Sequence, residues 1–194
     1  MSQKARAYIV GAYEHPTRKA DDKSVAQLHA EVARGALQDA GLTLADVDGY
    51  FCAGDLPGWD APGIGPFSMV EYLGLRLRHL DTTETWGSAY INHMAAAERA
   101  IAQGLCNVAL ITLAGRPRAE ARRPDADHAT QRPTSAEAQF ELPYGPVVSN
   151  MYGMCAARHM HLYGTTSEQL AWIKVAASHH AQHNPHAMLP QVVT

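Results

Sequence analysis

The hydrophobic and polar positions of the first 114 residues follow a pattern that predicts alternating strands and helices. Short apolar runs predict strands at residues 5–11, 49–54, 78–83 and 107–113. Apolar residues spaced three or four positions apart predict helices at residues 24–40, 67–73 and 88–103. Strands and helices that alternate in this way predict an α/β sheet wrapped by helices.

Local signals mark where the predicted helices begin and end. Ser24 and Gln27 have the spacing of a capping box at the start of the first helix, and Gly41 follows its last residue. Gly104 follows the last residue of the third helix. Residues 55–66 contain three prolines and three glycines and are therefore predicted to form a loop.

The pattern changes after residue 114. Residues 115–146 are rich in arginine and proline and have no helical or strand periodicity, which predicts an excursion from the sheet. Two further helices are predicted at residues 147–163 and 167–183. The chain therefore divides into a predicted α/β core at residues 1–114, an excursion at 115–146 and a helical segment at 147–194.

Composition places the chain among soluble globular proteins. Of its 194 residues, 46% are hydrophobic and 18% charged, which argues against disorder. The formal net charge of -3 gives no footprint for nucleic acid or an anionic membrane, and no apolar run is long enough to span one. Cys52, Cys106 and Cys155 are odd in number and widely spaced, so we expect neither disulfides nor a zinc site. We predict a cytoplasmic protein.

Residues 81–90 (DTTETWGSAY) form the most informative junction of the chain. A predicted strand leads to a tight turn at Trp86, Gly87 and Ser88, where an Ala-rich helix begins. The N–H groups at the start of a helix point at whatever lies beyond it, an arrangement that suits an oxyanion or a thioester carbonyl. The junction is therefore the first candidate for a binding site.

Motifs in a fixed order run along nearly the whole chain. They are IVG at residues 9–11, ALQDAG at 36–41, DVDG at 46–49, GS at 87–88, the Ala-rich run at 95–104, NVAL at 107–110, FELPYG at 140–145, YGTTSEQLA at 163–171 and HHAQHNP at 179–185. Together they resemble the thiolase superfamily, in the branch related to sterol carrier protein x and the bacterial lipid-transfer-protein thiolases. The resemblance implies a thiolase-like α/β fold, with this chain as its N-terminal βαβαβαβ half and the excursion after the fourth strand.

The resemblance also points to the position of the family's nucleophile. A thiolase carries its nucleophilic Cys in the turn before the central helix, 17 residues ahead of the glycine that ends it, and counting back from Gly104 gives Gly87. The hydroxyl of Ser88 needs an adjacent base to attack, and the pattern assigns none. We therefore assign no catalytic residue in this chain and expect no acyl-enzyme chemistry.

The family fold consists of two similar halves, and the resemblance implies that its catalytic His and second Cys or Tyr come from the C-terminal half. An isolated first half exposes an apolar helix face and a sheet edge, which predicts obligate assembly. We expect a homodimer, and relatives of this kind imply an OB-fold, zinc-ribbon partner protein. The resemblance implies no bound cofactor and no metal; a CoA thioester enters as substrate.

The candidate substrate-binding residues are Trp86, Gly87, Ser88 and Tyr144. At the turn, an acyl-CoA pocket and a vestigial site in which Gly87 serves only the turn both remain open. A pocket role and a packing role are equally open for Tyr144. The excursion offers weak candidates for the CoA phosphates, against the alternative of a solvated loop. These are Arg116, Arg118, Arg122 and Arg123, with Arg132 in the same segment.

His179 and His183 lie one helical turn apart, a spacing that can bind a metal. No carboxylate of the same helix joins them, and the resembled family uses no metal. A structural or surface role is therefore the favoured interpretation.

Three functional hypotheses follow from the resemblance. Family members without the Cys include aldolases that cleave a β-hydroxyacyl-CoA by retro-aldol chemistry, which needs a base and enolate stabilisation but no nucleophile. Their acid/base residues, thought to be tyrosines, lie in the C-terminal half. The first hypothesis is such a carbon–carbon lyase, acting in steroid or lipid degradation. The second is a non-catalytic thiolase-fold subunit that binds acyl-CoA or lipid and scaffolds a partner, and the third is a thiolase or acyltransferase.

Overall fold

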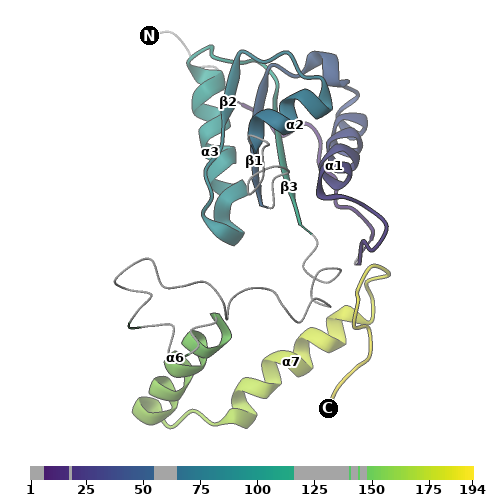
Figure 1. The fold of residues 1–194 in the computed structure, drawn as a ribbon. Coiled ribbons are helices and arrows are strands. Elements are labelled where there is room, and N and C mark those ends of the chain that lie inside the picture. Colours follow the sequence, from purple (N-terminus) through teal and green to yellow (C-terminus); the bar gives the residue numbers. More distant parts are fainter. Residues whose placement is uncertain (1–6, 18, 55–64, 116–139, 141–143, 145–147) are drawn as a thin grey trace. The chain divides into compact units, whose positions relative to one another are not determined.

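The computed structural model describes residues 7–17, 19–54, 65–115, 140, 144 and 148–194 (Figure 1). The chain divides into two units, Met1–Arg122 and Arg123–Thr194. The predicted boundaries at residues 114 and 146 lie beside or within segments outside the described residues, so they stay a prediction.

The first unit is built on a three-stranded parallel sheet. Its strands are β1 (Gly49–Gly54), β2 (His79–Asp81) and β3 (Ala109–Ala114), in the order β2-β1-β3. Gly49 pairs with His79 on one side and with Ala109 on the other, so the amino ends of all three strands lie at one edge of the sheet. Parallel neighbours need long crossover connections, and the helices supply them.

Helices cover both faces of the sheet. Figure 1 shows α1 (Val25–Ala40) and α3 (Ala89–Ala102) on opposite sides of the strands, with α2 (Pro66–Leu73) between β1 and β2 in the chain. Successive residues of β1 face opposite sides. Tyr50 belongs to the buried cluster that contains Ala33 of α1, whereas Phe51 packs with Ala97 of α3. Burial on both faces explains why these strands are continuous apolar runs.

The helix boundaries follow the predicted local signals. The Gln27 N–H donates to Ser24 Oγ at 3.1 Å and the Ser24 N–H donates to Gln27 Oε1 at 2.7 Å, which completes the capping box. Gly41 and Gly104 have φ values of 69° and 71°, a left-handed backbone that favours glycine after a helix. Two single 3₁₀ turns, η1 (Leu44–Asp46) and η2 (Trp86–Ser88), lead into β1 and α3.

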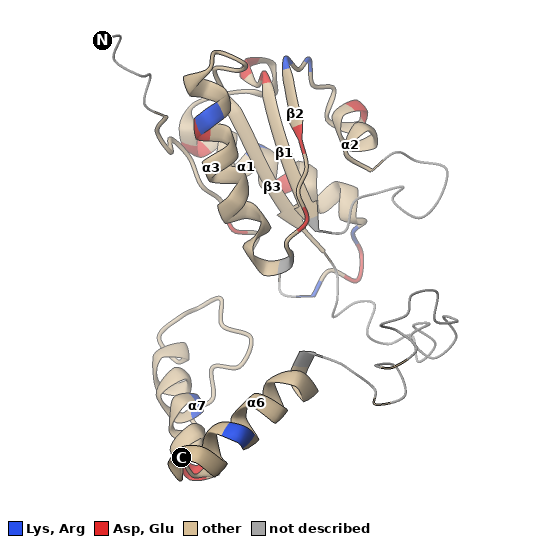
Figure 2. Ribbon diagram, turned by 90° about the vertical axis from the view of Figure 1, so that its left-hand side faces the viewer, with Lys and Arg blue, Asp and Glu red and all other residues tan. Residues whose placement is uncertain are grey.

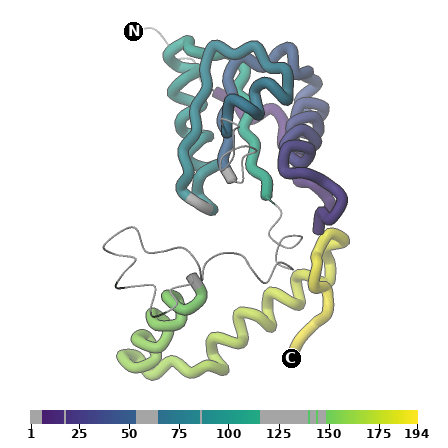
Figure 3. Tube along the Cα trace, viewed as in Figure 1, coloured from purple at the N-terminus to yellow at the C-terminus, as the bar shows by residue number. Residues whose placement is uncertain are grey.

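The predicted first strand, residues 5–11, is wrong for the part that the structure describes. Residues 7–11 have no strand, and Tyr8, Ile9 and Val10 are 78%, 78% and 63% exposed. The segment instead runs beside α1, in purple in Figure 3, where the Ala12 N–H donates to Asp39 Oδ2 at 2.9 Å. A strand requires a hydrogen-bonded neighbour, and none of the three described strands pairs with this segment.

The second unit contains α6 (Val148–Tyr163) and α7 (Ser167–Ala181), which confirms both predicted helices. Residue 147 lies outside the described residues, and α7 ends two residues before the predicted end at 183. Thr166 and Gln169 form a capping box at the start of α7. Figure 2 shows that these helices carry few charged residues. Among the described residues, no helix combines the length and the apolar character needed to cross a membrane.

Candidate functional site

The candidate site lies at the carboxyl end of the sheet, where residues 82–88 connect β2 to α3. The Thr82 hydroxyl donates to the Cys52 carbonyl of β1 at 2.8 Å, which fixes the start of this segment to the neighbouring strand. The Thr83 N–H donates to His93 Nε2 of α3 at 3.0 Å. The connection is therefore attached both to the sheet and to the helix that follows it.

Polar side chains order the turn itself. The Ser88 hydroxyl donates to the Thr85 carbonyl at 2.8 Å, and the Asn92 amide donates to Thr85 Oγ1 at 2.8 Å. Ser88 has no side-chain capping bond to the helix, so its hydroxyl closes the turn instead. Among the described residues, the oxygens of Thr85 are the recorded hydrogen-bond partners of Ser88 Oγ. The Ser88 hydroxyl is therefore engaged within the turn itself.

Gly87 has open space where a side chain would stand. A Cβ built on Gly87 meets no atom within 4 Å, and its φ lies outside the left-handed region. The residue is also exposed. Backbone geometry therefore gives no reason for a glycine at this position, because an L-residue fits it without strain.

His93 is a buried polar residue of the site that the sequence analysis missed. It is 1% exposed, and its ring lies 6.0 Å from the Phe51 ring. Burial lowers the pKa of His93, and the opposing effects of Asp81, Glu84 and the Thr83 backbone do not cancel it. Its spacing in the sequence could have indicated that it is buried. His93 lies four positions from both Ala89 and Ala97, two buried residues of the same helix.

The thiols near the sheet are not reactive groups. Cys52 is fully buried in β1, and burial raises its pKa to about 11. Burial also raises the pKa of Cys106, which is 1% exposed. Cys155 is exposed on α6, in the second unit. Both thiols of the first unit are therefore protonated at neutral pH.

The structure brings some predicted site residues together and leaves others undescribed. Trp86, Gly87 and Ser88 form η2, although the side chain of Trp86 is not among those described. Tyr144 belongs to the second unit and is 85% exposed. Its predicted pocket role therefore stays a prediction. The excursion arginines lie outside the described residues: Arg116, Arg118, Arg122, Arg123 and Arg132.

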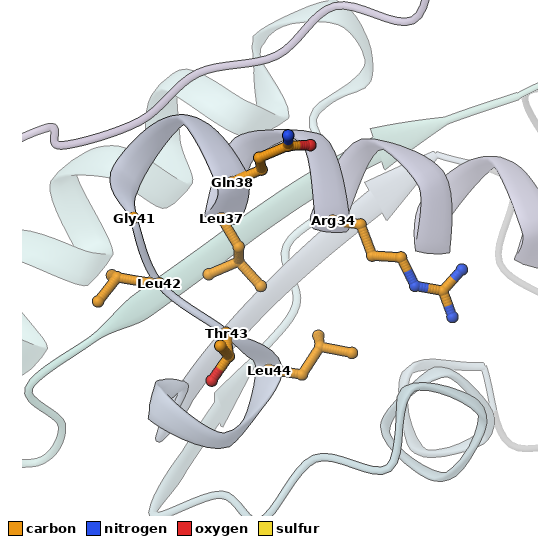
Figure 4. Close-up of a pocket in the computed structure, with 7 residues that line it drawn as sticks. All are labelled: Arg34, Leu37, Gln38, Gly41, Leu42, Thr43 and Leu44. Atoms are coloured by element: carbon orange, nitrogen blue, oxygen red, sulfur yellow. The ribbon is translucent and has the colours of Figure 1, made fainter.

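A shallow hollow of about 430 Å³ lies elsewhere, between the end of α1 and η1 (Figure 4). Leu37, Leu42 and Leu44 line it, with Arg34 at its rim. Because η1 precedes the amino end of β1, this hollow lies at the edge of the sheet opposite to the Gly87 turn. None of the predicted site residues that the structure describes lines it.

Histidine, cysteine and carboxylate side chains do not gather into a metal site in the described part of the chain, where no group of three or more is close enough to hold an ion. His179 and His183 follow the same pattern: no third ligand of these types joins them among the described residues.

No protein-family model matches the chain. The chain is 28% identical over 192 residues to an acetyl-CoA acetyltransferase of Methanothermobacter thermautotrophicus, an alignment that covers 96% of this chain and 48% of that protein. It is 30% identical over 199 residues to the 17-hydroxy-3-oxo-4-pregnene-20-carboxyl-CoA lyase of Mycobacterium tuberculosis, covering 94% of this chain and 47% of the lyase. A solved structure, the Ltp2-ChsH2(DUF35) aldolase, matches with a TM-score of 0.73 at 26% identity, over 95% of this chain and 45% of that one.

These similarities confirm the predicted fold class. The chain has a thiolase-like α/β fold, and its relatives carry the names of acetyltransferases, aldolases and lyases. It spans about half the length of the curated relatives it matches.

Proposed function

We propose that this chain is part of a thiolase-like aldolase, a carbon–carbon lyase that acts on a β-hydroxyacyl-CoA from steroid or lipid degradation. Its similarity to a pregnene-carboxyl-CoA lyase and to an aldolase complex supports this class of reaction. The observation that carries the proposal is the unfilled space at Gly87, at the start of α3.

Retro-aldol cleavage needs no enzyme nucleophile. A base takes the proton of the β-hydroxyl, the bond between the α and β carbons breaks, and a ketone leaves. The electron pair stays on the thioester as an enolate, which takes a proton at its α carbon to give the shortened acyl-CoA. The reaction therefore requires room for a bulky substrate and hydrogen-bond donors for the enolate oxygen.

Two features of the turn support the proposal, one for each requirement. Gly87 stands 17 residues before Gly104, the spacing at which the resembled family carries its Cys, and the position offers space instead of a thiol. The 14-residue helix α3 begins two residues later, and the N–H groups of its first turn carry partial positive charge. We assign these N–H groups to the thioester oxygen.

Thiolase chemistry at this turn lacks a suitable nucleophile in the described part of the chain. Cys52 and Cys106 are buried and protonated, and the Ser88 hydroxyl donates to the Thr85 carbonyl. A hydroxyl without a base beside it is a poor nucleophile. The same geometry leaves room for a Cys in Gly87→Cys, so thiolysis by that variant would favour the third hypothesis, a thiolase or acyltransferase.

The decisive experiment is a turnover assay with β-hydroxyacyl-CoA esters, of steroids and of simple chains, followed by mass spectrometry. The full-length enzyme is assayed alone and co-expressed with candidate OB-fold, zinc-ribbon partners. The expected result is a ketone and a shortened acyl-CoA in equal amounts. Formation of neither product under any condition would overturn the proposal.

A matched pair of variants tests the role of the open space. Gly87→Val fills the space at the turn and is expected to lower kcat/KM at least about 100-fold, since small misplacements in an active site cost this much. Gly153→Val is the control, because Gly153 of α6 also has no atom within 4 Å of an added Cβ. Equal activities of the two variants would show that the substrate does not occupy the space at Gly87.

The second candidate is a non-catalytic subunit that binds acyl-CoA or lipid and scaffolds a partner. The observation that favours it is the absence, among the described residues, of any base hydrogen-bonded to Ser88. Calorimetric titration with CoA esters separates the two candidates. Binding without turnover, in the presence of every partner tested, supports the scaffold.

The assembly and the location belong to the same proposal. The solved relative is named as a complex of two proteins, which supports a partner chain. We also propose that the protein forms a homodimer, binds an OB-fold zinc-ribbon partner and is located in the cytoplasm. Size-exclusion chromatography with light scattering on the purified chain, alone and with each partner, tests the assembly.

A further inference from the structure

A buried histidine stands behind the Gly87 turn. His93 lies on α3 and is 1% exposed. Its ring lies 6.0 Å from the Phe51 ring and is hydrogen-bonded to the Thr83 backbone. The two flanking positions on the same helix face, Ala89 and Ala97, are small apolar residues. A polar ring in such surroundings carries a desolvation cost, so its presence calls for a specific contact.

That contact fixes the protonation state of the ring. The Thr83 N–H donates to Nε2 at 3.0 Å, so Nε2 bears no proton and the neutral ring carries its proton on Nδ1. No described residue accepts a hydrogen bond from the buried Nδ1. An apolar side chain of the same size would avoid this unpaired donor, so packing alone does not explain the histidine.

The hydrogen bond between Thr83 and His93 lies in the segment that leads to Gly87. Three of the hydrogen bonds that hold the segment leading to Gly87 join it to β1 or α3: Thr82 binds the Cys52 carbonyl, Thr83 binds His93, and Thr85 binds Asn92. Of the three, the second alone involves a group that titrates near neutral pH. If Nε2 were protonated, its N–H would face the Thr83 N–H, and the hydrogen bond between Thr83 and His93 would be lost.

We propose that His93 is the positioning residue of the Gly87 turn: its neutral Nδ1–H tautomer accepts the Thr83 N–H and holds residues 83–88 in the conformation that presents Gly87. The turn is ordered while His93 is neutral and is released when the ring is protonated. The catalytic consequence rests on the proposed function, but the structural claim does not.

The charges around the ring set the direction of the pH dependence. Asp81 of β2 and Glu84 of the turn favour the charged ring, and His79 of β2 lies on Phe51, with ring centroids 5.3 Å apart. Burial has the larger effect and lowers the pKa of His93 below its usual 6.5. The turn is therefore expected to stay ordered at neutral pH and to open as pH falls below that value.

The test is nuclear magnetic resonance of the isotope-labelled chain. The ring nitrogen shifts of His93 are expected to report the Nδ1–H tautomer at neutral pH. In His93→Leu the Thr83 amide should exchange with solvent about tenfold faster, the factor that loss of one hydrogen bond gives. In His93→Gln, whose amide oxygen can accept the same N–H, exchange should stay close to the wild-type rate.

The pH titration distinguishes positioning from packing. The Gly87 amide shift is expected to titrate with a midpoint below pH 6.5 in the wild type, and to lose this titration in His93→Gln. His161→Gln, at an exposed position of α6, is the control, and the Gly87 amide shift should still titrate in this variant. An Nε2–H tautomer, or a Gly87 titration unchanged in His93→Gln, would overturn the proposal even if His93→Leu fails to fold.

Activity assays keep this proposal separate from the proposed function. If the chain is an aldolase, the kcat of the wild type should fall at acidic pH. This fall should be absent in His93→Gln, and KM should be nearly the same in both proteins. If no turnover is found but Thr83 exchange and the Gly87 titration behave as stated, the positioning role stands without the aldolase.

Discussion

The two ends of the β-sheet in the first unit are built in opposite ways. At the amino end, Asp48 accepts the N–H groups of Asn107 at 2.7 Å and Val108 at 2.8 Å, and its second carboxyl oxygen lies 3.5 Å from the Arg78 guanidinium. A Cβ built on Gly49 would stand 2.7 Å from Cys106 Sγ. At the carboxyl end, a Cβ on Gly87 meets nothing within 4 Å.

The difference separates stability from chemistry. The amino end joins β1, β2 and β3 through the carboxylate of Asp48 and through close packing at Gly49. The carboxyl end joins the same sheet to α3 through an exposed turn, in which a Cβ on Gly87 would meet no atom. Open α/β sheets bind ligands outside the carboxyl ends of their strands. We therefore expect substitutions to change stability at one end and activity at the other.

The largest effect is expected from Asp48→Ala. Burial opposes ionisation of this carboxyl, but the N–H groups of Val108 and Asn107 and the charge of Arg78 outweigh it and lower the pKa of Asp48. Hydrogen bonds to a charged group contribute about 1.5–3 kcal/mol, so the free energy of unfolding should fall by about 3 kcal/mol. Urea denaturation followed by circular dichroism measures it. Asp21→Ala, which removes an exposed carboxylate paired with Lys19, is the control and should change it by less than about 0.5 kcal/mol.

The same pair of proteins makes a prediction about acid. Because the pKa of Asp48 is lowered in the folded state, its stabilising effect is complete above the unfolded carboxyl value of about 3.9 and is lost as pH falls through the folded value. The stability difference between wild type and Asp48→Ala should therefore shrink below about pH 4. A difference that stays constant down to pH 3 would contradict this electrostatic role.

An intermediate effect is expected from Gly49→Ala. The added methyl group would overlap Cys106 Sγ at 2.7 Å and Cβ at 2.9 Å, and overpacking of a buried site costs about 1–3 kcal/mol. The free energy of unfolding should fall by about 2 kcal/mol. In a double-mutant cycle, Cys106→Ala should recover part of that loss because it removes the sulfur that the methyl group meets. Additive effects of the two substitutions would show that the overlap is relieved elsewhere.

The smallest stability effect is expected from Gly87→Ala, the counterpart of Gly49→Ala at the other end. The open space and the ordinary φ predict a change of less than about 0.5 kcal/mol. A loss comparable to that of Gly49→Ala would contradict the comparison between the two ends. If Gly87→Ala leaves the stability unchanged but alters acyl-CoA binding, the comparison between the two ends is strengthened, because the position then serves the ligand alone.

Much of the fold was predictable because its signals are local. The capping boxes at Ser24 and Thr166 and the left-handed glycines at 41 and 104 depend on residues within a few positions of one another. The apolar runs of β1 and β3 are long enough to identify buried strands. The Gly87 turn could be located from the sequence because its distance from Gly104 is a count along one helix. Whether it binds acyl-CoA stays a prediction.

Tertiary structure decided whatever depends on distant partners. Residues 7–11 have strand composition, but a strand exists only with a hydrogen-bonded neighbour, and contacts with Asp39 and the rest of α1 hold this segment instead. The role of Asp48 depends on amides 59 and 60 residues away, and that of His93 on a backbone group ten residues earlier. The sequence by itself determined the helices, their ends and the place of the turn, because these follow from neighbouring residues. The fold decided that Gly87 has open space around it and that a buried histidine lies behind the turn, because burial and hydrogen bonding arise only when β1, β2 and α3 pack together.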